Sequence, residues 1–218
     1  MSSPVRPLPP LPAGKLRLGT LVFDNVDLLD IMGPMRIFGE QRNKLDVEVY
    51  FVGAVSDDFV TSSQTVRVKP DYSLDNAPHL DFFLIPGGLG TRTMVLDQAL
   101  MAKIKKRAEE ATYTLTVCTG AGVLAATGLA DGYRMTTNKL AFAWPESVGP
   151  NVHWIKKARF VQDGKYVSSS GVSAGMDMSL HVTSQLASEE NAQEIADYIE
   201  YTWHKDGNDD PFYKVHMA

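Results

Sequence analysis

Short apolar runs alternate with longer amphipathic segments along the chain from residue 16 onward. The runs that predict strands are 16–23, 46–55, 65–70, 80–86, 112–117 and 133–137. The segments with helical spacing of apolar positions are 26–41, 96–111, 118–128, 173–187 and 188–203. A chain that alternates strands and helices in this way is expected to form an α/β fold, in which crossover helices join mostly parallel strands.

Local features refine this pattern at three places. The run LDFFLIP (80–86) is almost wholly apolar, which is typical of a central strand covered on both faces. Pro34 is expected to kink or restart the first helix, because proline lacks the backbone donor that a helix interior needs. The Asp163-Gly164 pair predicts a turn that joins two strands within 152–170.

No internal repeat or shift of composition divides the chain, so we expect a single domain over residues 16–204. Residues 1–15 are rich in proline and are expected to form a flexible tail, and residues 205–218 are expected to form an irregular C-terminal tail. No apolar run has the length of a secretory signal core, and none approaches the roughly 18–20 residues that cross a bilayer. The sequence therefore predicts a cytoplasmic protein with no membrane partner.

The composition excludes several classes of function. Lys and Arg total 21 against 26 Asp and Glu, a formal net charge of −5. No basic surplus exists to neutralise a phosphate backbone, so nucleic acid is not an expected partner. Cys118 is the only cysteine, which excludes an intramolecular disulfide framework and a zinc site of several cysteines. We therefore expect no metal site and look for chemistry at Cys118 itself.

Cys118 lies where the apolar run TYTLTV meets the small-residue segment TGAGVLAA. The small residues Gly120 and Gly122 permit a sharp turn like that of a nucleophile elbow, although Thr116 stands where the first elbow glycine would be. A thiol at the start of a helix meets unpaired N–H groups and the positive end of the helix dipole, so we expect a lowered pKa and a nucleophilic thiolate. The alternative is a buried, inert cysteine.

Asp30 is the most unusual carboxylate of the sequence, because it lies in the apolar stretch LLDIMGP. An acid in such surroundings tends to have a raised pKa and to exchange a proton. The alternative is a helix-terminus carboxylate bonded to backbone. No histidine is adjacent to Cys118, so the sequence assigns no Cys-His pair and each histidine is interpreted as a surface or satisfied polar residue. The histidines are His79, His153, His181, His204 and His216.

Backbone N–H groups at two strand ends are candidate oxyanion donors. Thr119 follows the cysteine directly, and Gly87 and Gly88 belong to the PGGLG loop after the run 80–86. Strand ends on one edge of a parallel sheet are where sites form. The loop does not match the G-x-G-x-x-G pattern of a dinucleotide site, and no phosphate-loop lysine follows it, so we expect no nucleotide cofactor.

Four stretches together carry a resemblance to a known family. They are LVFDNVDLLDIMGPMRIFG, LDFFLIPGGLGTR, TVCTGAGVLAATGLADGYRMTTNKLAF and SSSGVSAGMDMSLHV. In this order they resemble the DJ-1/PfpI superfamily, and in particular its isocyanide (isonitrile) hydratase branch. The resemblance implies a flavodoxin-like α/β sandwich of three layers, a homodimer and a cysteine at the elbow between a strand and a helix.

The resemblance also implies a reaction. In hydratases of this branch the thiolate adds to the terminal carbon of R–N≡C, and an acid with its ordered water supplies and removes protons. Water then releases an N-substituted formamide, and no cofactor is needed. By this resemblance Cys118 is the nucleophile and Asp30 the acid/base. The residues implied to surround them are Gly88, Thr119, Gly171 and Val172.

Three positions depart from family patterns. Asn138-Lys139 stands where bacterial hydratases tend to carry His-Trp, so a different pocket wall is expected. Thr119 stands where protease-like relatives carry a histidine, which disfavours proteolysis. Asp30 stands where glyoxalase-type members usually carry a glutamate, which weakens a glyoxalase-type activity.

Two alternatives to a cofactor-free hydratase of a small-molecule isocyanide stay open. The first is another enzyme on the same scaffold, either of glyoxalase type or in specialised metabolism. The second is a non-enzymatic redox sensor, in which Cys118 is oxidised beside Asp30.

Overall fold

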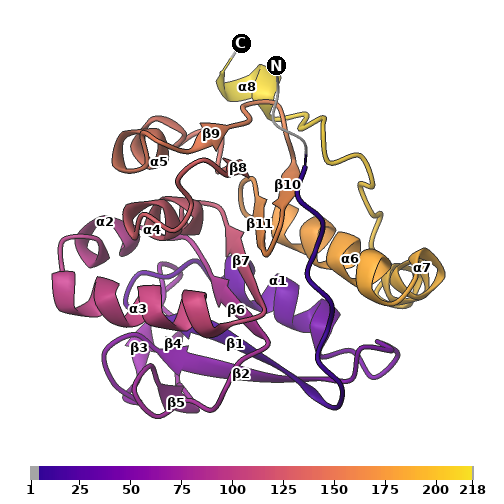
Figure 1. Ribbon diagram of the computed structural model, residues 1–218, viewed down its shortest axis with the longest axis horizontal. Helices are drawn as coiled ribbons and strands as arrows, with labels where there is room; N and C mark the ends of the chain where they lie inside the picture. Colours follow the sequence, from indigo (N-terminus) through magenta and orange to yellow (C-terminus); the bar gives the residue numbers. More distant parts are fainter. Residues whose placement is uncertain (1–4, 218) are drawn as a thin grey trace.

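The computed structural model describes residues 5–217, which form a seven-stranded sheet in the order β10-β11-β7-β6-β1-β2-β5 (Figure 1). All neighbouring strands of this sheet are parallel except β10 and β11. Its strands are β1 (Leu16–Val22), β2 (Val47–Gly53), β5 (Tyr72–Ser73), β6 (Phe82–Ile85), β7 (Tyr113–Val117), β10 (Phe160–Asp163) and β11 (Tyr166–Ser169). Two small sheets pair β3 (Val60–Thr61) with β4 (Arg67–Val68), and β8 (Arg134–Met135) with β9 (His153–Trp154).

Helices cover both faces of the large sheet. The helices are α1 (Leu28–Phe38), α2 (Thr91–Met94), α3 (Gln98–Glu110), α4 (Gly120–Ala126), α5 (Ala143–Val148), α6 (Ala174–Leu186), α7 (Glu189–Tyr198) and α8 (Tyr213–His216). Figure 1 shows α1, α6 and α7 on one side of the sheet and α3 and α4 on the other. This arrangement confirms the predicted three-layer, flavodoxin-like α/β sandwich. Among residues 5–217, no helix is both long enough and apolar enough to span a membrane.

The central strand β6 explains why residues 82–85 are apolar at every position. Phe82 and Leu84 belong to the core cluster that includes side chains of α1 and α6, whereas Phe83 and Ile85 belong to the cluster that includes side chains of α3 and α4. All four side chains are fully buried. Burial of each stabilises the fold by about 1.5–3 kcal/mol, so both sides of β6 must be apolar, as predicted.

The structure differs from two local predictions, a restart of the helix at Pro34 and an unbroken first strand within 152–170. Pro34 lies inside α1, which continues through it without restarting, because its burial with neighbours such as Ile37 compensates the one lost backbone donor. The predicted first strand of 152–170 is split, because the exposed Lys156 and Lys157 form a turn. The predicted hairpin is confirmed only for β10 and β11, which pair on either side of Gly164.

Two further predicted elements are shorter than expected. The run 133–137 forms only the two-residue β8, outside the large sheet. The predicted helix 118–128 begins at Gly120 and ends at Ala126. Cys118 therefore precedes the helix instead of belonging to it.

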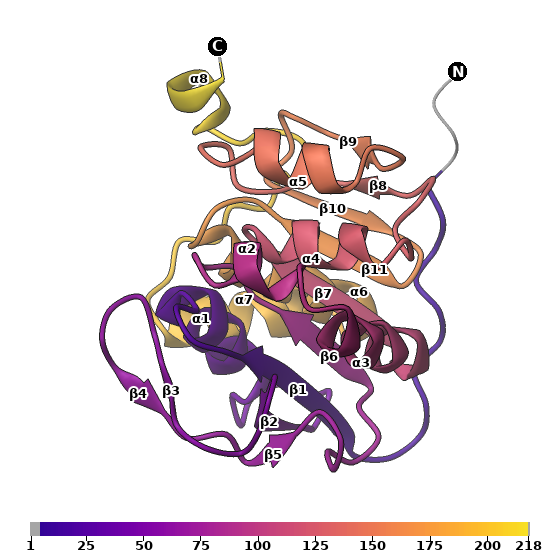
Figure 2. The same cartoon turned by 90° about the vertical axis from the view of Figure 1, so that its left-hand side faces the viewer.

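Both ends of the described chain lie against the sheet domain. Near the N-terminus, the Arg6 guanidinium pairs with Asp163 at 2.8 Å and stacks over the Tyr133 ring. Near the C-terminus, Asp210 is buried and the segment ends in α8, where the sequence predicted only irregular structure. Figure 2 shows α8 above the main body, on the same side as α5 and β9.

The start of α4 yields a stability prediction. A Cβ at Gly120 would lie 2.0 Å from the Ile85 carbonyl oxygen, so Gly120→Ala must push α4 away from β6. We expect a loss of about 2–3 kcal/mol in the free energy of unfolding, measured by urea titration. Helix propensity alone gives the opposite sign, a gain of about 1 kcal/mol. The control Ala126→Gly, at the exposed end of the same helix, should cost only about 1 kcal/mol, and equal or greater stability of Gly120→Ala would contradict the close contact.

Candidate active site

Four connections at the carboxyl edge of the sheet meet at one point. Asp30 lies on α1 after β1, Gly87 follows β6, Cys118 follows β7, and Val172 follows β11. Because these strands are parallel, their carboxyl ends share one edge of the sheet. Strand β1 pairs with β2 along one edge and with β6 along its other edge. The order of strands in the sheet therefore reverses direction between β1 and β6, and the site lies beside this topological switch point. The sequence-predicted residues 30, 87, 118 and 172 are thus brought together.

Backbone hydrogen bonds hold Cys118 in an uncommon conformation. Its φ of 56° lies in the left-handed region, which costs a residue other than glycine about 1–3 kcal/mol. The Cys118 N–H donates to the carbonyls of Ser170 at 3.0 Å and Ser169 at 3.3 Å, and its own carbonyl accepts from the Thr137 hydroxyl at 2.8 Å. These bonds from β11 and the segment after β8 fix the predicted elbow between β7 and α4.

Asp30 is fully buried, with only part of its hydrogen-bonding capacity used. The Gly87 N–H donates to its Oδ2 at 2.8 Å, while Oδ1 meets no hydrogen-bond donor among residues 5–217. Burial, with the Asp27 charge in support, raises the pKa of Asp30 well above its ordinary value, and the Gly87 N–H and the Cys118 thiol oppose this rise. Asp30 is therefore a strong base for a carboxylate, with one oxygen open to a proton.

The predicted low pKa of Cys118 is wrong. The side chain is only 7% exposed, and burial together with the nearby Asp30 charge raises the pKa of the thiol above its ordinary value. The backbone N–H groups of Thr119 and Val172 act in the opposite direction but are outweighed. In addition, α4 has only seven residues, so its dipole contributes little. The raised pKa favours the thiol form of Cys118, so a nearby base such as Asp30 would be required for Cys118 to act as a nucleophile.

Gly87 and Gly88 position this pair, and their N–H groups are engaged within the protein instead of serving as oxyanion donors. Gly87 binds Asp30 as described, and the Gly88 N–H donates to the Thr119 hydroxyl at 3.2 Å. A Cβ at Gly87 would lie 2.7 Å from the Thr119 nitrogen and 2.8 Å from Asp30 Oδ2. Only glycine fits where the β6 loop approaches so closely. The N–H groups that face the sulfur belong to Thr119 and Val172.

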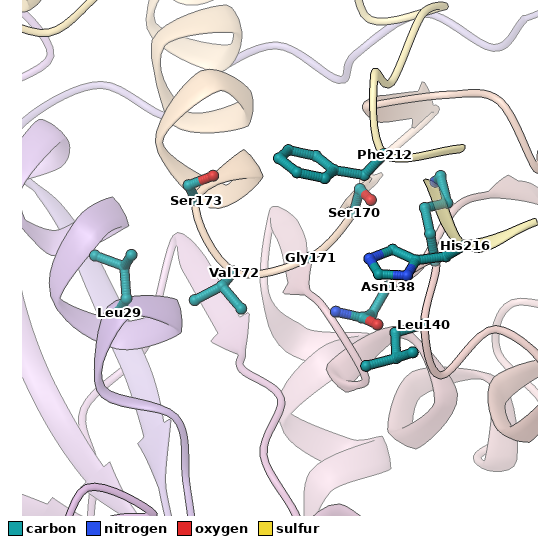
Figure 3. Close-up of a pocket in the computed structure, with 10 residues that line it drawn as sticks. Leu29, Asn138, Leu140, Ser170, Gly171, Val172, Ser173, Phe212 and His216 are labelled. Atoms are coloured by element: carbon teal, nitrogen blue, oxygen red, sulfur yellow. The ribbon is translucent and has the colours of Figure 1, made fainter. Parts of the chain in front are cut away.

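A pocket of about 250 Å³ is lined by the loop after β11 and by the start of α1 (Figure 3). Cys118 and Asp30 do not line it themselves. Gly171 and Val172 form part of its wall, and Val172 also faces the sulfur through its N–H group. Leu29 lines it beside Asp30. The lining residues are Leu29, Asn138, Lys139, Leu140, Ser170, Gly171, Val172, Ser173, Phe212 and His216.

Several of these residues were beyond the reach of sequence reasoning. The sequence pointed to the pocket wall only through Gly171, Val172 and the pair Asn138-Lys139. Phe212 and His216 come from the segment expected to be an irregular tail, and His216 was interpreted as an ordinary surface residue. Neither carries a periodicity or spacing that relates it to Cys118. Among residues 5–217, no group of three or more His, Cys, Asp or Glu side chains is arranged to hold a metal.

Comparisons with known proteins agree with this geometry. The sequence model described as the DJ-1/PfpI family matches residues 17–185. An isonitrile hydratase from Pseudomonas putida is 33% identical over 189 residues, which cover 85% of this chain and 78% of that protein. The HTH-type transcriptional regulator GbdR from Pseudomonas aeruginosa is 27% identical over 199 residues, 89% of this chain and 53% of the regulator.

A solved structure is also similar. The structure of a THiJ/PfpI family protein from Pseudomonas syringae matches with a TM-score of 0.78 and 28% sequence identity. The match covers 86% of this chain and 76% of that one. The similarity therefore extends over the sheet and the helices that position the cysteine.

The Asp30 charge should be visible in the titration of Cys118. Because a neighbouring negative charge raises the pKa of a thiol, Asp30→Asn should lower the pKa of Cys118 by at least about one unit, although burial keeps it above the ordinary value. Ultraviolet absorbance of the thiolate, measured against pH, follows this titration. The signal belongs to Cys118 because it is the only cysteine. Asp27→Asn is the control, because Asn caps α1 as well as Asp and the Asp27 charge is the smallest cause of the shift. Equal titrations of the wild type and Asp30→Asn would contradict this electrostatic account.

The buried Asp30 also predicts how stability depends on pH. Its pKa is raised from 3.8 by burial, so above about pH 4 the folded protein retains a proton that the unfolded chain releases. The free energy of unfolding therefore falls as the pH rises toward the raised pKa. Asp30→Asn has no such proton, so its stability relative to the wild type should grow from pH 4 to 8, by on the order of 1 kcal/mol. Urea titrations at several pH values test this, and a difference that stays constant with pH would refute it.

Proposed function

Because the chain belongs to the DJ-1/PfpI family, we propose that it hydrates a small isocyanide, R–N≡C, to an N-substituted formamide, with Cys118 as the nucleophile and Asp30 as the acid/base. The observation that carries the proposal is the buried pair of Asp30 and the only cysteine, in which one carboxylate oxygen has no protein donor among residues 5–217. The similarity to an isonitrile hydratase over most of the chain supports this choice of reaction.

The raised pKa values suit the first step. Asp30 takes the proton from the Cys118 thiol while Sγ forms a bond to the terminal isocyanide carbon, and the same proton then passes from Asp30 to that carbon. The product is a thioimidate, R–N=CH–S. A base with a raised pKa accepts the thiol proton more readily than an ordinary carboxylate does. A thiolate formed from a high-pKa thiol is also intrinsically more nucleophilic.

Water completes the reaction through the same carboxylate. Asp30 takes one proton from water as its oxygen adds to the thioimidate carbon, and gives this proton to the nitrogen. The hydroxyl proton then returns to sulfur by way of Asp30 as the C–S bond breaks. The formamide R–NH–CHO leaves and the thiol is restored, so one water is consumed and no redox change occurs. The N–H groups of Thr119 and Val172, which face the sulfur, stabilise negative charge on it in both directions.

The redox-sensor alternative receives less support from the site. Oxidation of a sensor cysteine follows thiolate character and exposure, and Cys118 is protonated and buried. A glyoxalase-type reaction uses the same pair of residues, so methylglyoxal belongs in the assay as a competing substrate. The homodimer and the cytoplasmic location stay predictions.

The proposed function is tested by the consumption of cyclohexyl isocyanide, with N-cyclohexylformamide identified as the product. We expect turnover by the wild type, no measurable turnover by Cys118→Ala because the nucleophile is lost, and a kcat about 10²–10⁴-fold lower for Asp30→Asn because proton transfer is lost. Asp75→Asn, an exposed acid that pairs with Lys103, is the matched control and should keep wild-type kcat.

Circular dichroism of each variant shows whether the fold is retained. Undiminished turnover by folded Cys118→Ala would refute the proposed mechanism. Conversion of methylglyoxal to lactate with no isocyanide consumption would transfer the function to the glyoxalase-type alternative.

A further inference from the structure

We propose that Phe212 and His216, here called the C-terminal wall, determine substrate specificity at this site. They would select isocyanides whose substituent is a ring-sized apolar group that carries one hydrogen-bonding group. The inference rests on the proposed function and narrows its substrate class.

The segment that carries the C-terminal wall is anchored from within the fold. Asp210 is 1% exposed, and its carboxylate pairs with Lys139 Nζ at 3.5 Å and with Arg159 Nη1 at 3.6 Å. Its N–H donates to the Lys157 carbonyl at 2.7 Å, and the Arg159 N–H donates to the Gly207 carbonyl at 2.8 Å. Two backbone bonds and two buried ion pairs therefore hold residues 207–210 in place, a few residues before the wall.

Lys139 is built into this anchor and into the pocket. Its ammonium group donates to the Ala158 carbonyl at 2.6 Å and to the Thr136 hydroxyl at 2.9 Å. Burial lowers its pKa to about 8, and the Asp210 charge opposes the shift. Lys139 is therefore charged at neutral pH and needs Asp210 to compensate its buried charge. Removal of one partner from such a pair is costly, so the C-terminal segment is a fixed part of the pocket.

The pocket that the wall completes has an apolar side and a polar corner. Leu29 and Val172 line it from the sheet domain, Leu140 lines it next to Asn138, and Phe212 lines it from the C-terminal segment. Figure 3 shows Phe212 and His216 reaching from this segment toward the loop of Gly171, and His216 and Asn138 both line the pocket. Leu140 and Phe212 are 77% and 48% exposed, and exposed apolar side chains gathered at a pocket mark a ligand-binding surface.

The dimensions and polar groups of the pocket give the substrate class. Its volume of about 250 Å³ exceeds the roughly 150 Å³ that accommodates benzene in an apolar cavity, so a six-membered ring with a small substituent fits. The imidazole of His216 and the side-chain nitrogen of Asn138 offer hydrogen bonds at one corner, whereas Asn138 Oδ1 already accepts from the Ala141 N–H. Val172 lines the pocket and its N–H group faces Sγ, so we expect the substituent of an isocyanide bound at Sγ to extend into this space.

The C-terminal wall lies after the residues that the family model matches. The family match ends at residue 185, before the anchor at Asp210 and before both wall residues. Cys118 and Asp30 lie within the matched region, and the proposed specificity residues lie after it.

Steady-state kinetics with three isocyanides test the wall. For Phe212→Ala we expect KM for cyclohexyl and 4-hydroxycyclohexyl isocyanide to rise about tenfold, with kcat within twofold and methyl isocyanide unaffected. For His216→Ala we expect a rise of about fivefold or more for the hydroxylated substrate alone. Val215→Ala, an exposed neighbour that does not line the pocket, is the matched control and should change none of these constants.

A binding measurement separates this inference from the proposed reaction. N-cyclohexylformamide is titrated into Cys118→Ala protein by calorimetry, with and without Phe212→Ala. Suppose that the wild type hydrates no isocyanide, but that N-cyclohexylformamide binds and Phe212→Ala lowers its affinity about tenfold. The role of the C-terminal wall in ligand binding is then supported, and the proposed function is refuted. The role of the C-terminal wall in specificity is refuted if Phe212→Ala leaves both KM and formamide affinity within twofold of their original values, or if the formamide does not bind. This conclusion holds for any reaction that the enzyme catalyses.

Discussion

The close approach of two strand ends, β6 and β7, is the constraint on which the site depends. The start of α4 lies against the Ile85 carbonyl, and the loop after β6 lies against Thr119 and Asp30, with no space for a side chain at either contact. Glycine at positions 120 and 87 makes these contacts possible. Because the parallel strands bring both loops to one edge, the same contacts that close the core also direct the Gly87 N–H at Asp30 and fix Cys118 in a left-handed conformation.

The electrostatics of the site follow from its burial. Asp30 and Cys118 are both nearly inaccessible to water, and burial is the largest cause of the raised pKa of each. A buried carboxylate with an unused oxygen costs stability, which is a common property of functional sites. The arrangement makes the acid a better base and the thiol dependent on it.

The region around Asn138-Lys139 shows how one pair of neighbouring residues affects distant segments. Asn138 contributes a polar side chain to the pocket, and Lys139 turns inward to pair with Asp210 near the C-terminus. The ion pair draws in a segment about 70 residues further along the chain, and that segment carries Phe212 and His216 into the pocket. The chemistry of the cysteine and the shape of the space beside it are thus set by different parts of the chain.

Local patterns in the sequence determined the fold class and the candidates for chemistry. The wholly apolar run of β6, the small residues after Cys118 and the acid within LLDIMGP are each visible in a few neighbouring residues, because period, size and charge are local properties. The split of the first predicted strand within 152–170 and the shortness of β8 were missed, since a turn at an exposed lysine pair and pairing outside the main sheet depend on tertiary context.

Only the tertiary structure decided the state of the cysteine and the walls of its pocket. The dipole argument predicted a thiolate, but burial and the charge of Asp30, 88 positions earlier in the sequence, reverse the shift. The buried pair of Lys139 and Asp210 and the wall residues Phe212 and His216 likewise join segments that no sequence period relates. Desolvation and Coulomb energies depend on distances in space. For residues far apart in the sequence, these distances are set by the folded structure and cannot be taken from the order of residues along the chain.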